Sequence, residues 1–203
     1  MIVTDMIPLT KNRYKVYIDN EFAFVLYKGE LHIYHIEMGE TLQEADYAEI
    51  MQVLLPKRAK LRAMNLLQKR NYTQKQLEDK LREGFYPETL IQDAIVYVKS
   101  YHYVDDLRYA VDYITYHENF KPMARIRDEL FRKGISKEIY EAAKSEWEEL
   151  GGRNDELTMI EEHLQKRGYS EDMELKEKRR IYAYLLRKGF SSETISKAMK
   201  NLT

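Results

Sequence analysis

Histidines are the side chains of this chain best suited to metal binding or proton transfer, and their spacing supports neither role. The chain has five His and no Cys, which excludes disulfides, thiolate nucleophiles and zinc sites with Cys ligands. His32 and His35 stand three apart in a strand-like stretch, where odd spacing sends side chains to opposite faces. His102, His117 and His163 have no second His at a metal-binding helical spacing. We therefore predict no metal site and no cofactor.

Asp105 and Asp106 form the one carboxylate pair in a setting that suggests chemistry. Adjacent residues at a helix start do not face each other, and Asp there commonly caps free backbone N–H groups, which is the interpretation we favour. The patterns G-x-x-x-x-G-K-[ST] and G-x-G-x-x-G do not occur, which excludes nucleotide cradles of those types. With no catalytic constellation, we predict that the chain is not an enzyme.

Tyrosine is abundant, with 17 residues in 203, and could stack on nucleic-acid bases. Tyr97, Tyr101, Tyr109 and Tyr113 fall at helical apolar positions. We therefore favour half-buried packing with a hydrated hydroxyl over base stacking. For Trp147, which stands among glutamates, we predict a core-facing ring.

Basic side chains concentrate in two places that the net charge of −1 conceals. By segment, the net charge is −5 for residues 1–55, +5 for 56–104, −3 for 105–152 and +2 for 153–203. Such clusters can contact phosphates or an acidic protein groove, while each residue alone is equally compatible with a solvated helix face. The candidate partner-binding residues are Lys57, Arg58, Lys60, Arg62, Lys69, Arg70, Lys176, Lys178, Arg179 and Arg180.

The elements that must position these residues begin with strands. Residues 14 to 36 alternate with a period of two, and Asp19-Asn20-Glu21 has turn chemistry, which predicts a β-hairpin. The apolar parity comprises Val16, Ile18, Phe22, Phe24 and Leu26. A third short strand is expected at residues 31 to 34. Thr41 with Glu44 has capping-box spacing and opens the helix expected to cover the sheet, before Pro56.

From residue 57 onward the spacing is helical, and a three-helix unit recurs. Leu67 to Thr73 matches Leu164 to Ser170 at six of seven positions, 97 residues apart. Thr73 with Gln76 predicts a capping box. Gly84, Gly134 and Gly189 each follow a helical stretch, and we predict that each ends a helix in a turn that favours positive φ.

The predicted fold is mostly α: an elongated tandem array of three three-helix repeats, preceded by a small N-terminal β-hairpin plus helix. The expected segments are residues 1–55 for the hairpin and helix, then 56–104, 105–152 and 153–203 for the three repeats.

The run Tyr103-Val104-Asp105-Asp106-Leu107-Arg108-Tyr109-Ala110 resembles the hallmark segment of the RecX family, regulatory proteins that modulate the RecA recombinase in bacteria. The resemblance extends from Ala59 to Thr203, and the three glycines fall where that family's repeats turn. The lengthened middle region of the third repeat departs from the pattern. The signature positions, for which we expect a structural role, are Tyr103, Asp105, Asp106, Tyr109, Ala110, Gly84, Gly134 and Gly189.

The resemblance implies a non-enzymatic regulator that binds the RecA nucleoprotein filament and limits its recombinase, ATPase and co-protease activities, and so regulates DNA repair and the SOS response. The basic clusters would then face acidic filament surface or the filament DNA. We expect a cytoplasmic protein, because the longest apolar run, Phe22 to Tyr27, is far too short to span a membrane. We also expect a monomer. Two alternatives stay open: a helical-repeat nucleic-acid-binding protein that acts without RecA, and a general protein-interaction scaffold.

Overall fold

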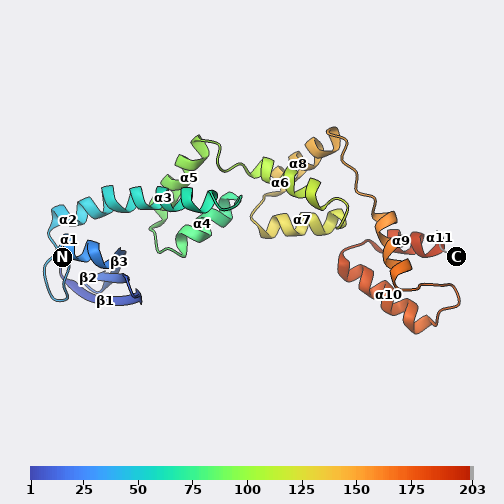
Figure 1. The fold of residues 1–203 in the computed structure, drawn as a ribbon, viewed down its shortest axis with the longest axis horizontal. Helices are drawn as coiled ribbons and strands as arrows, with labels where there is room; N and C mark the ends of the chain where they lie inside the picture. The colour runs from blue at the N-terminus through green and yellow to red at the C-terminus, as the bar shows by residue number, and fades with distance from the viewer. Residues whose placement is uncertain (202–203) are drawn as a thin grey trace. The chain divides into compact units, whose positions relative to one another are not determined.

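Three antiparallel strands begin the chain, and the elements described after them are helical (Figure 1). The computed structural model describes residues 1 to 201, which form two compact units divided between Val104 and Asp105. The strands are β1 (Val3–Thr10), β2 (Arg13–Ile18) and β3 (Glu21–Tyr27), in the order β1-β2-β3. Asp19 and Asn20 connect β2 to β3 with φ of 49° and 70°. Two positive φ values suit the twist of a two-residue hairpin, so the predicted hairpin is confirmed.

The third strand is not where the alternation of residues 31 to 34 predicted it. Most of those residues belong to α1 (Lys28–Ile33), and the third strand is the N-terminal β1. The carboxylate of Glu30 accepts the N–H of Tyr27 at 2.7 Å and satisfies a free donor at the start of α1. Leu31 is buried, whereas Lys28, Gly29, His32 and Ile33 are exposed, which is the one-sided burial of a short helix.

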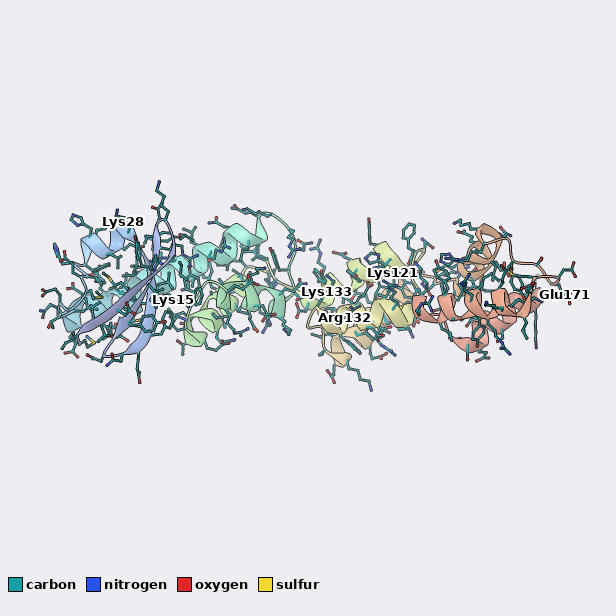
Figure 2. All side chains as sticks on the ribbon, turned by 90° about the horizontal axis from the view of Figure 1, so that it is seen from below. Lys15, Lys28, Lys121, Arg132, Lys133 and Glu171 are labelled. Carbon is teal, nitrogen blue, oxygen red and sulfur yellow. The ribbon has the colours of Figure 1, made fainter. Side chains whose placement is uncertain are left out.

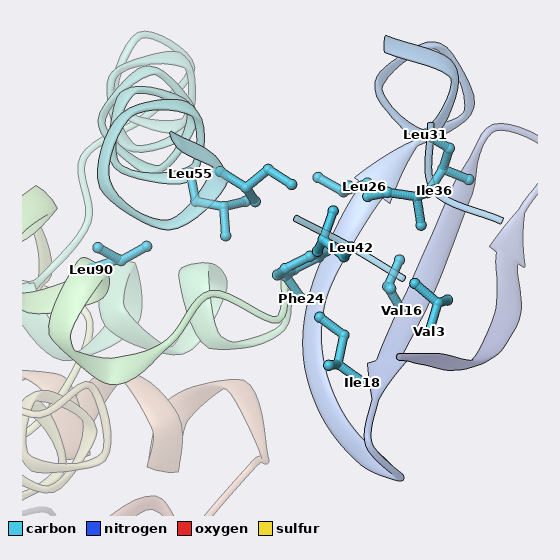
Figure 3. Packing of buried hydrophobic residues seen from close by; sticks show 11 residues of the cluster. Val3, Val16, Ile18, Phe24, Leu26, Leu31, Ile36, Leu42, Leu55 and Leu90 are labelled. Carbon is cyan, nitrogen blue, oxygen red and sulfur yellow. The ribbon is translucent and has the colours of Figure 1, made fainter. Parts of the chain in front are cut away.

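One face of the sheet forms the first core, shown in Figure 3. Phe24 and Leu26 are fully buried there, whereas Phe22 is 42% exposed although the alternation placed it with them. The pairing of β2 with β3 shifts register between Val16 and Tyr17. This irregularity gives β3 an extra residue, which reverses the side-chain parity and turns Phe22 away from the core.

A helical stretch covers the sheet, as predicted, but it begins and ends differently. The capping box of Thr41 with Glu44 is wrong: Thr41 pairs with Ile2 in an isolated bridge, and the helix starts at Glu44. The segments α2 (Glu44–Glu49), the π-helical turn η1 (Ile50–Leu54) and α3 (Leu55–Leu67) follow without interruption. Pro56 has no N–H group to donate within the helix. The wider π-helical turn lies directly before it, where the regular hydrogen-bond pattern is interrupted. The covering helix and the first repeat therefore belong to one unit.

Three groups of three helices follow, each with its own buried cluster. In each group the first and third helices make the most extensive contact. The predicted three-helix repeats are thus confirmed, and α10 takes up part of the added length in the third. The groups are α3 with α4 (Gln74–Arg82) and α5 (Glu88–Ser100); α6 (Asp106–His117), α7 (Met123–Arg132) and α8 (Lys137–Glu149); and α9 (Glu156–Lys166), α10 (Leu175–Lys188) and α11 (Ser192–Asn201).

The glycine turns follow the prediction in two repeats out of three. Gly134 and Gly189 have φ of 92° and 101°, in the region that favours glycine. Gly84 does not, because the positive φ of the first repeat falls on Phe85, at 64°. Gly84 is instead required by space, since a Cβ there would lie 2.9 Å from the carbonyl oxygen of Leu81.

Candidate partner-binding surface

The helix α3 carries four of the predicted cations and no carboxylate, and its geometry divides them between two flanks. Ala59 faces the core and is fully buried. At 100° per residue, Arg58 and Arg62 lie on one side of Ala59, and Lys57 and Lys60 on the other. These cations therefore do not form a single patch.

Arg58 is engaged by the fold of the first unit. Its guanidinium pairs with Glu30 at 2.7 Å, donates to the carbonyl of Val25 at 3.0 Å and lies 5.0 Å from the ring centroid of Tyr27. Its side chain is only 15% exposed. Arg58 thus fastens α3 to β3 and α1, and we leave it out of the surface offered to partners.

Arg13 has a similar fastening role. It donates to the carbonyl of Gly84 at 3.3 Å, which joins β2 to the turn after α4. Burial raises the pKa of the nearby Tyr86 hydroxyl, and the positive charges of Arg58, Arg13 and Arg62 oppose that rise. Three guanidinium charges therefore act on the Tyr86 hydroxyl, and of these Arg62 is exposed.

On the opposite flank of α3, Lys60 adjoins a row of tyrosines. Its ammonium lies 5.2 Å from the ring centroid of Tyr97, which packs edge-on against Tyr101. Tyr101 stacks on Tyr103 with ring centroids 5.9 Å apart and planes 16° from parallel. Tyr101 and Tyr103 are 55% and 52% exposed, so half-buried packing is wrong for Tyr101. We call Lys60, Tyr97, Tyr101 and Tyr103 the tyrosine strip.

The remaining predicted cations lie on accessible surface, with one exception. Lys69 and Arg70 are exposed just after α3, and the Arg70 guanidinium lies 4.3 Å from the ring centroid of Tyr72. Lys178 of α10 is half-buried and donates to the carbonyl of Glu171. Lys176, Arg179 and Arg180 are exposed on the same helix.

Part of the signature segment around α6 has structural contacts, as expected, whereas its Tyr103 is exposed. The carboxylate of Asp105 accepts the N–H of Arg108 at 3.0 Å and caps α6, which confirms the capping interpretation for this residue. Asp106 is the first residue of the helix. Ala110 is fully buried, and the half-buried Tyr109 stacks on Tyr113.

Trp147 faces the core of the second repeat, as predicted. It is 4% exposed, and its indole N–H donates to the carboxylate of Glu118. A Cβ on Gly152 would lie 2.1 Å from the Trp147 ring, so the turn after α8 closes directly over the indole.

Sequence reasoning missed a third gathering of cations, in the segment with a net charge of −3. Lys121, Arg125, Arg132 and Lys133 surround Glu129 in the second repeat. The signal was present in the spacing, because Arg125, Glu129 and Arg132 stand at i, i+4 and i+7 on one face of α7. Counting charge over a whole segment hid it.

The part of the chain that the structure describes contains neither a cluster of metal-binding side chains nor a helix that could span a membrane. Within residues 1 to 201, no three His, Asp or Glu side chains gather closely enough to hold a metal ion. None of the helices described combines the length and the apolar character that crossing a bilayer requires.

Known proteins resemble this chain in both sequence and fold. Residues 59–97 match the model of the first three-helix domain of RecX, and residues 154–199 match that of the third. Regulatory protein RecX of Caldanaerobacter subterraneus subsp. tengcongensis is 31% identical over 205 residues, which cover 100% of both chains. Its counterpart in Clostridium acetobutylicum is 31% identical over 95% of this chain and 91% of the relative.

Two solved structures have a similar fold. A crystal structure of regulatory protein RecX superimposes with a TM-score of 0.61 at 23% identity, covering 97% of this chain and 98% of that one. RecX from Lactobacillus salivarius gives a TM-score of 0.56 at 28% identity, over 73% of this chain and 96% of that one.

Proposed function

The chain belongs to the RecX family of regulatory proteins, and from that membership we propose that it binds the RecA nucleoprotein filament and limits its recombinase, ATPase and co-protease activities. The observation that carries the proposal is the match to a regulatory protein RecX along the full length of both chains. The same role makes this protein a cytoplasmic, non-enzymatic regulator of DNA repair and the SOS response.

Two sets of mostly exposed basic side chains support the proposal. The first comprises the exposed Lys57, Arg62, Lys69 and Arg70 and the half-buried Lys60, which lie on both flanks of α3 and just after it, and we call this set the α3 surface. The second comprises Lys176, Arg179 and Arg180 in the second unit, and we call it the α10 surface. A partner built from repeated protomers can engage both, and two linked weak contacts hold far more tightly than either alone. Acidic filament surface or the DNA backbone supplies the complementary charge.

An ATPase assay with cognate RecA on single-stranded DNA tests the proposal. We expect the wild-type protein to inhibit, and Arg62→Glu with Arg70→Glu to raise the half-inhibitory concentration about tenfold or more, because reversed charges at an interface repel the partner. Lys137→Glu with Lys197→Glu changes the net charge equally at exposed positions outside both surfaces and should leave inhibition unchanged. Absence of any effect of the wild-type protein at stoichiometric amounts would refute the proposal.

The tyrosine strip favours one second candidate, a nucleic-acid-binding repeat protein that acts without RecA. Stacked, exposed rings beside a cation are a suitable platform for the bases of a single strand. Binding of single-stranded DNA by the protein alone, with a steep salt dependence, would favour it. Tyr101→Ala with Tyr103→Ala should then abolish that binding, whereas Tyr116→Ala, at a tyrosine 74% exposed, should not.

A further inference from the structure

An open hollow of about 340 Å³ lies on the second repeat, outside both basic surfaces. Tyr113 lines it from α6, Lys121 from the connection to α7, Glu129 and Arg132 from α7, and Lys133 from the residue after it. Figure 2 labels Lys121, Arg132 and Lys133 on the yellow part of the ribbon. The lining thus holds three cations and one carboxylate, in a segment of negative net charge.

Glu129 is the organising group of the hollow. One carboxylate oxygen accepts the Tyr113 hydroxyl at 2.6 Å and the Lys121 ammonium at 2.5 Å, and the other accepts the Arg125 Nε–H at 3.0 Å. Burial alone would raise the pKa of Glu129, but the hydrogen bonds from Lys121, Tyr113 and Arg125 lower it to about 2. The carboxylate is therefore ionised at neutral pH, and both of its oxygens accept hydrogen bonds from the protein. It balances one positive charge.

Two further cations line the hollow beside the pair formed by Lys121 and Glu129. The ammonium groups of Lys121 and Lys133 lie 5.6 Å and 5.3 Å from the ring centroid of Tyr113, so both flank the same ring. The Nε of Arg132 donates to the carbonyl of Asp128 at 3.3 Å, an acceptor that carries no full charge. The Asp128 carboxylate pairs with Arg127, which does not line the hollow.

His117 adds no positive charge at neutral pH. Its ring packs against Tyr113 with centroids 4.3 Å apart. Burial lowers the pKa of His117, and the cations Lys121 and Lys133 lower it further, while Glu129 opposes them. The positive excess of the hollow therefore comes from Lys and Arg and does not depend on histidine protonation.

We propose that this hollow binds a phosphate group, with Lys121, Arg132 and Lys133 as its ligands and Glu129 as the positioning residue. A phosphate group supplies a negative charge and several acceptor oxygens, which match three cations that two short segments bring to one hollow. Openness to solvent suits a group carried on a larger molecule as well as a free ion. The shared chemistry is the phosphate, whether from free phosphate or from a nucleic-acid backbone.

Calorimetric titration of the full chain with two probes, inorganic phosphate and a 12-nucleotide oligothymidylate, tests the site and separates its sources. Arg132→Gln with Lys133→Gln should weaken phosphate binding about tenfold or more, as expected for lost charge-assisted hydrogen bonds. Arg127→Gln with Lys137→Gln is the matched control, since it removes the same charges from exposed positions on α7 and α8. The control should bind like the wild type.

Each outcome of the titration either supports or overturns the proposed site. If the Arg132 and Lys133 variant loses binding to both probes, the result supports a site for backbone phosphate. If it loses binding to inorganic phosphate alone, the result supports a site for the free anion. Undetectable binding of both probes by the wild type, an adventitious response equal in variant and control, or loss of the oligonucleotide alone overturns the proposal. Arg132→Lys with Lys133→Arg keeps the charges and should retain binding, which distinguishes lost ligands from a folding defect. RecA is absent, so this proposal and the proposed function fail independently.

Discussion

Both compact units place basic side chains around one half-buried glutamate, but with opposite results. In the first unit, Glu30 meets Arg58, whose guanidinium also donates to the Val25 carbonyl and lies over Tyr27. In the second unit, Glu129 accepts from three donors while further cations line the same hollow. The first cluster pairs one cation with one carboxylate, whereas the lining of the second holds three cations and one carboxylate.

We infer from this difference that the ratio of cations to nearby carboxylates separates a basic cluster that fastens elements from one that can face a partner. The segment with net charge +5 contributes Arg58, a fastening residue, whereas the segment with net charge −3 contains the hollow that we propose to bind phosphate. Charge summed along the chain therefore does not identify the binding surface. The acceptors around each cation show which cations are engaged within the fold.

The largest expected effect is at the glutamate of the second unit. Glu129→Gln should lower the free energy of unfolding at pH 7 by about 3 kcal/mol, because the pKa of this carboxyl falls from 4.5 to about 2 on folding. A carboxyl whose pKa is lowered by folding stabilises the folded state when the pH lies above the pKa of the unfolded chain. The wild type should therefore lose this stability as the pH falls from about 4.5 to about 2. Urea unfolding across that range checks it, with the exposed Glu141→Gln as control. An equal acid loss in the variant and the wild type would contradict it.

Gly189→Ala tests whether the third repeat braces the same cluster. The φ of Gly189 is 101°, and an added Cβ would lie 3.2 Å from the Cβ of Arg125, which donates to Glu129. We expect a loss of about 2 kcal/mol from strain and displacement together. Thermal unfolding measures it, with Gly29→Ala as control, where an added Cβ has nothing within 4 Å. Equal stability of the two variants would show that the turn tolerates a side chain.

Arg58→Gln probes the fastening cluster of the first unit. It removes the ion pair with Glu30 and the bond to the Val25 carbonyl, and should cost about 1.5 kcal/mol. Lys57→Gln removes the same charge from an exposed neighbour and should stay within about 0.5 kcal/mol of the wild type. Chemical denaturation followed by circular dichroism compares them. If both substitutions cost the same, Arg58 is a surface cation after all.

The smallest effect concerns the signature segment at the start of the second unit. Asp105→Ala should lower the free energy of unfolding by about 1 kcal/mol, because the Arg108 N–H loses its acceptor. Asp112→Ala, at an exposed position on the same helix, should have no such effect. Loss of RecA inhibition at an unchanged melting temperature would assign Asp105 a contact role instead of a structural one.

Much of the fold could be predicted from the sequence, because its signals are local. The Thr73 box is present, with the hydroxyl accepting the Gln76 N–H at 3.2 Å, and Asp19 and Asn20 form the predicted turn. Features that depend on tertiary contacts could not be predicted from the sequence. No local sequence pattern indicated that a strand would form at residues 3 to 10. Nor did any pattern indicate that Phe85 would take the positive φ expected of Gly84.

The candidate surfaces were less predictable for the same reason. Exposed Arg62 and half-buried Arg58 are indistinguishable in a list of basic residues, and the distinction comes from Glu30, 28 positions earlier in the chain. The tyrosine strip likewise depends on the turn after α5, which exposes Tyr101 and brings Tyr103 over it. Helical spacing on α7 was the one sequence signal that could have revealed the hollow.

The central claim is that this protein binds the RecA filament, and an electron cryo-microscopy reconstruction of RecA on single-stranded DNA with the full chain added tests it most directly. We predict additional density along the filament that fits the three-helix units, with the α3 and α10 surfaces against RecA or the DNA. Filaments without added density at saturating protein, under conditions where the protein remains folded, would contradict the claim.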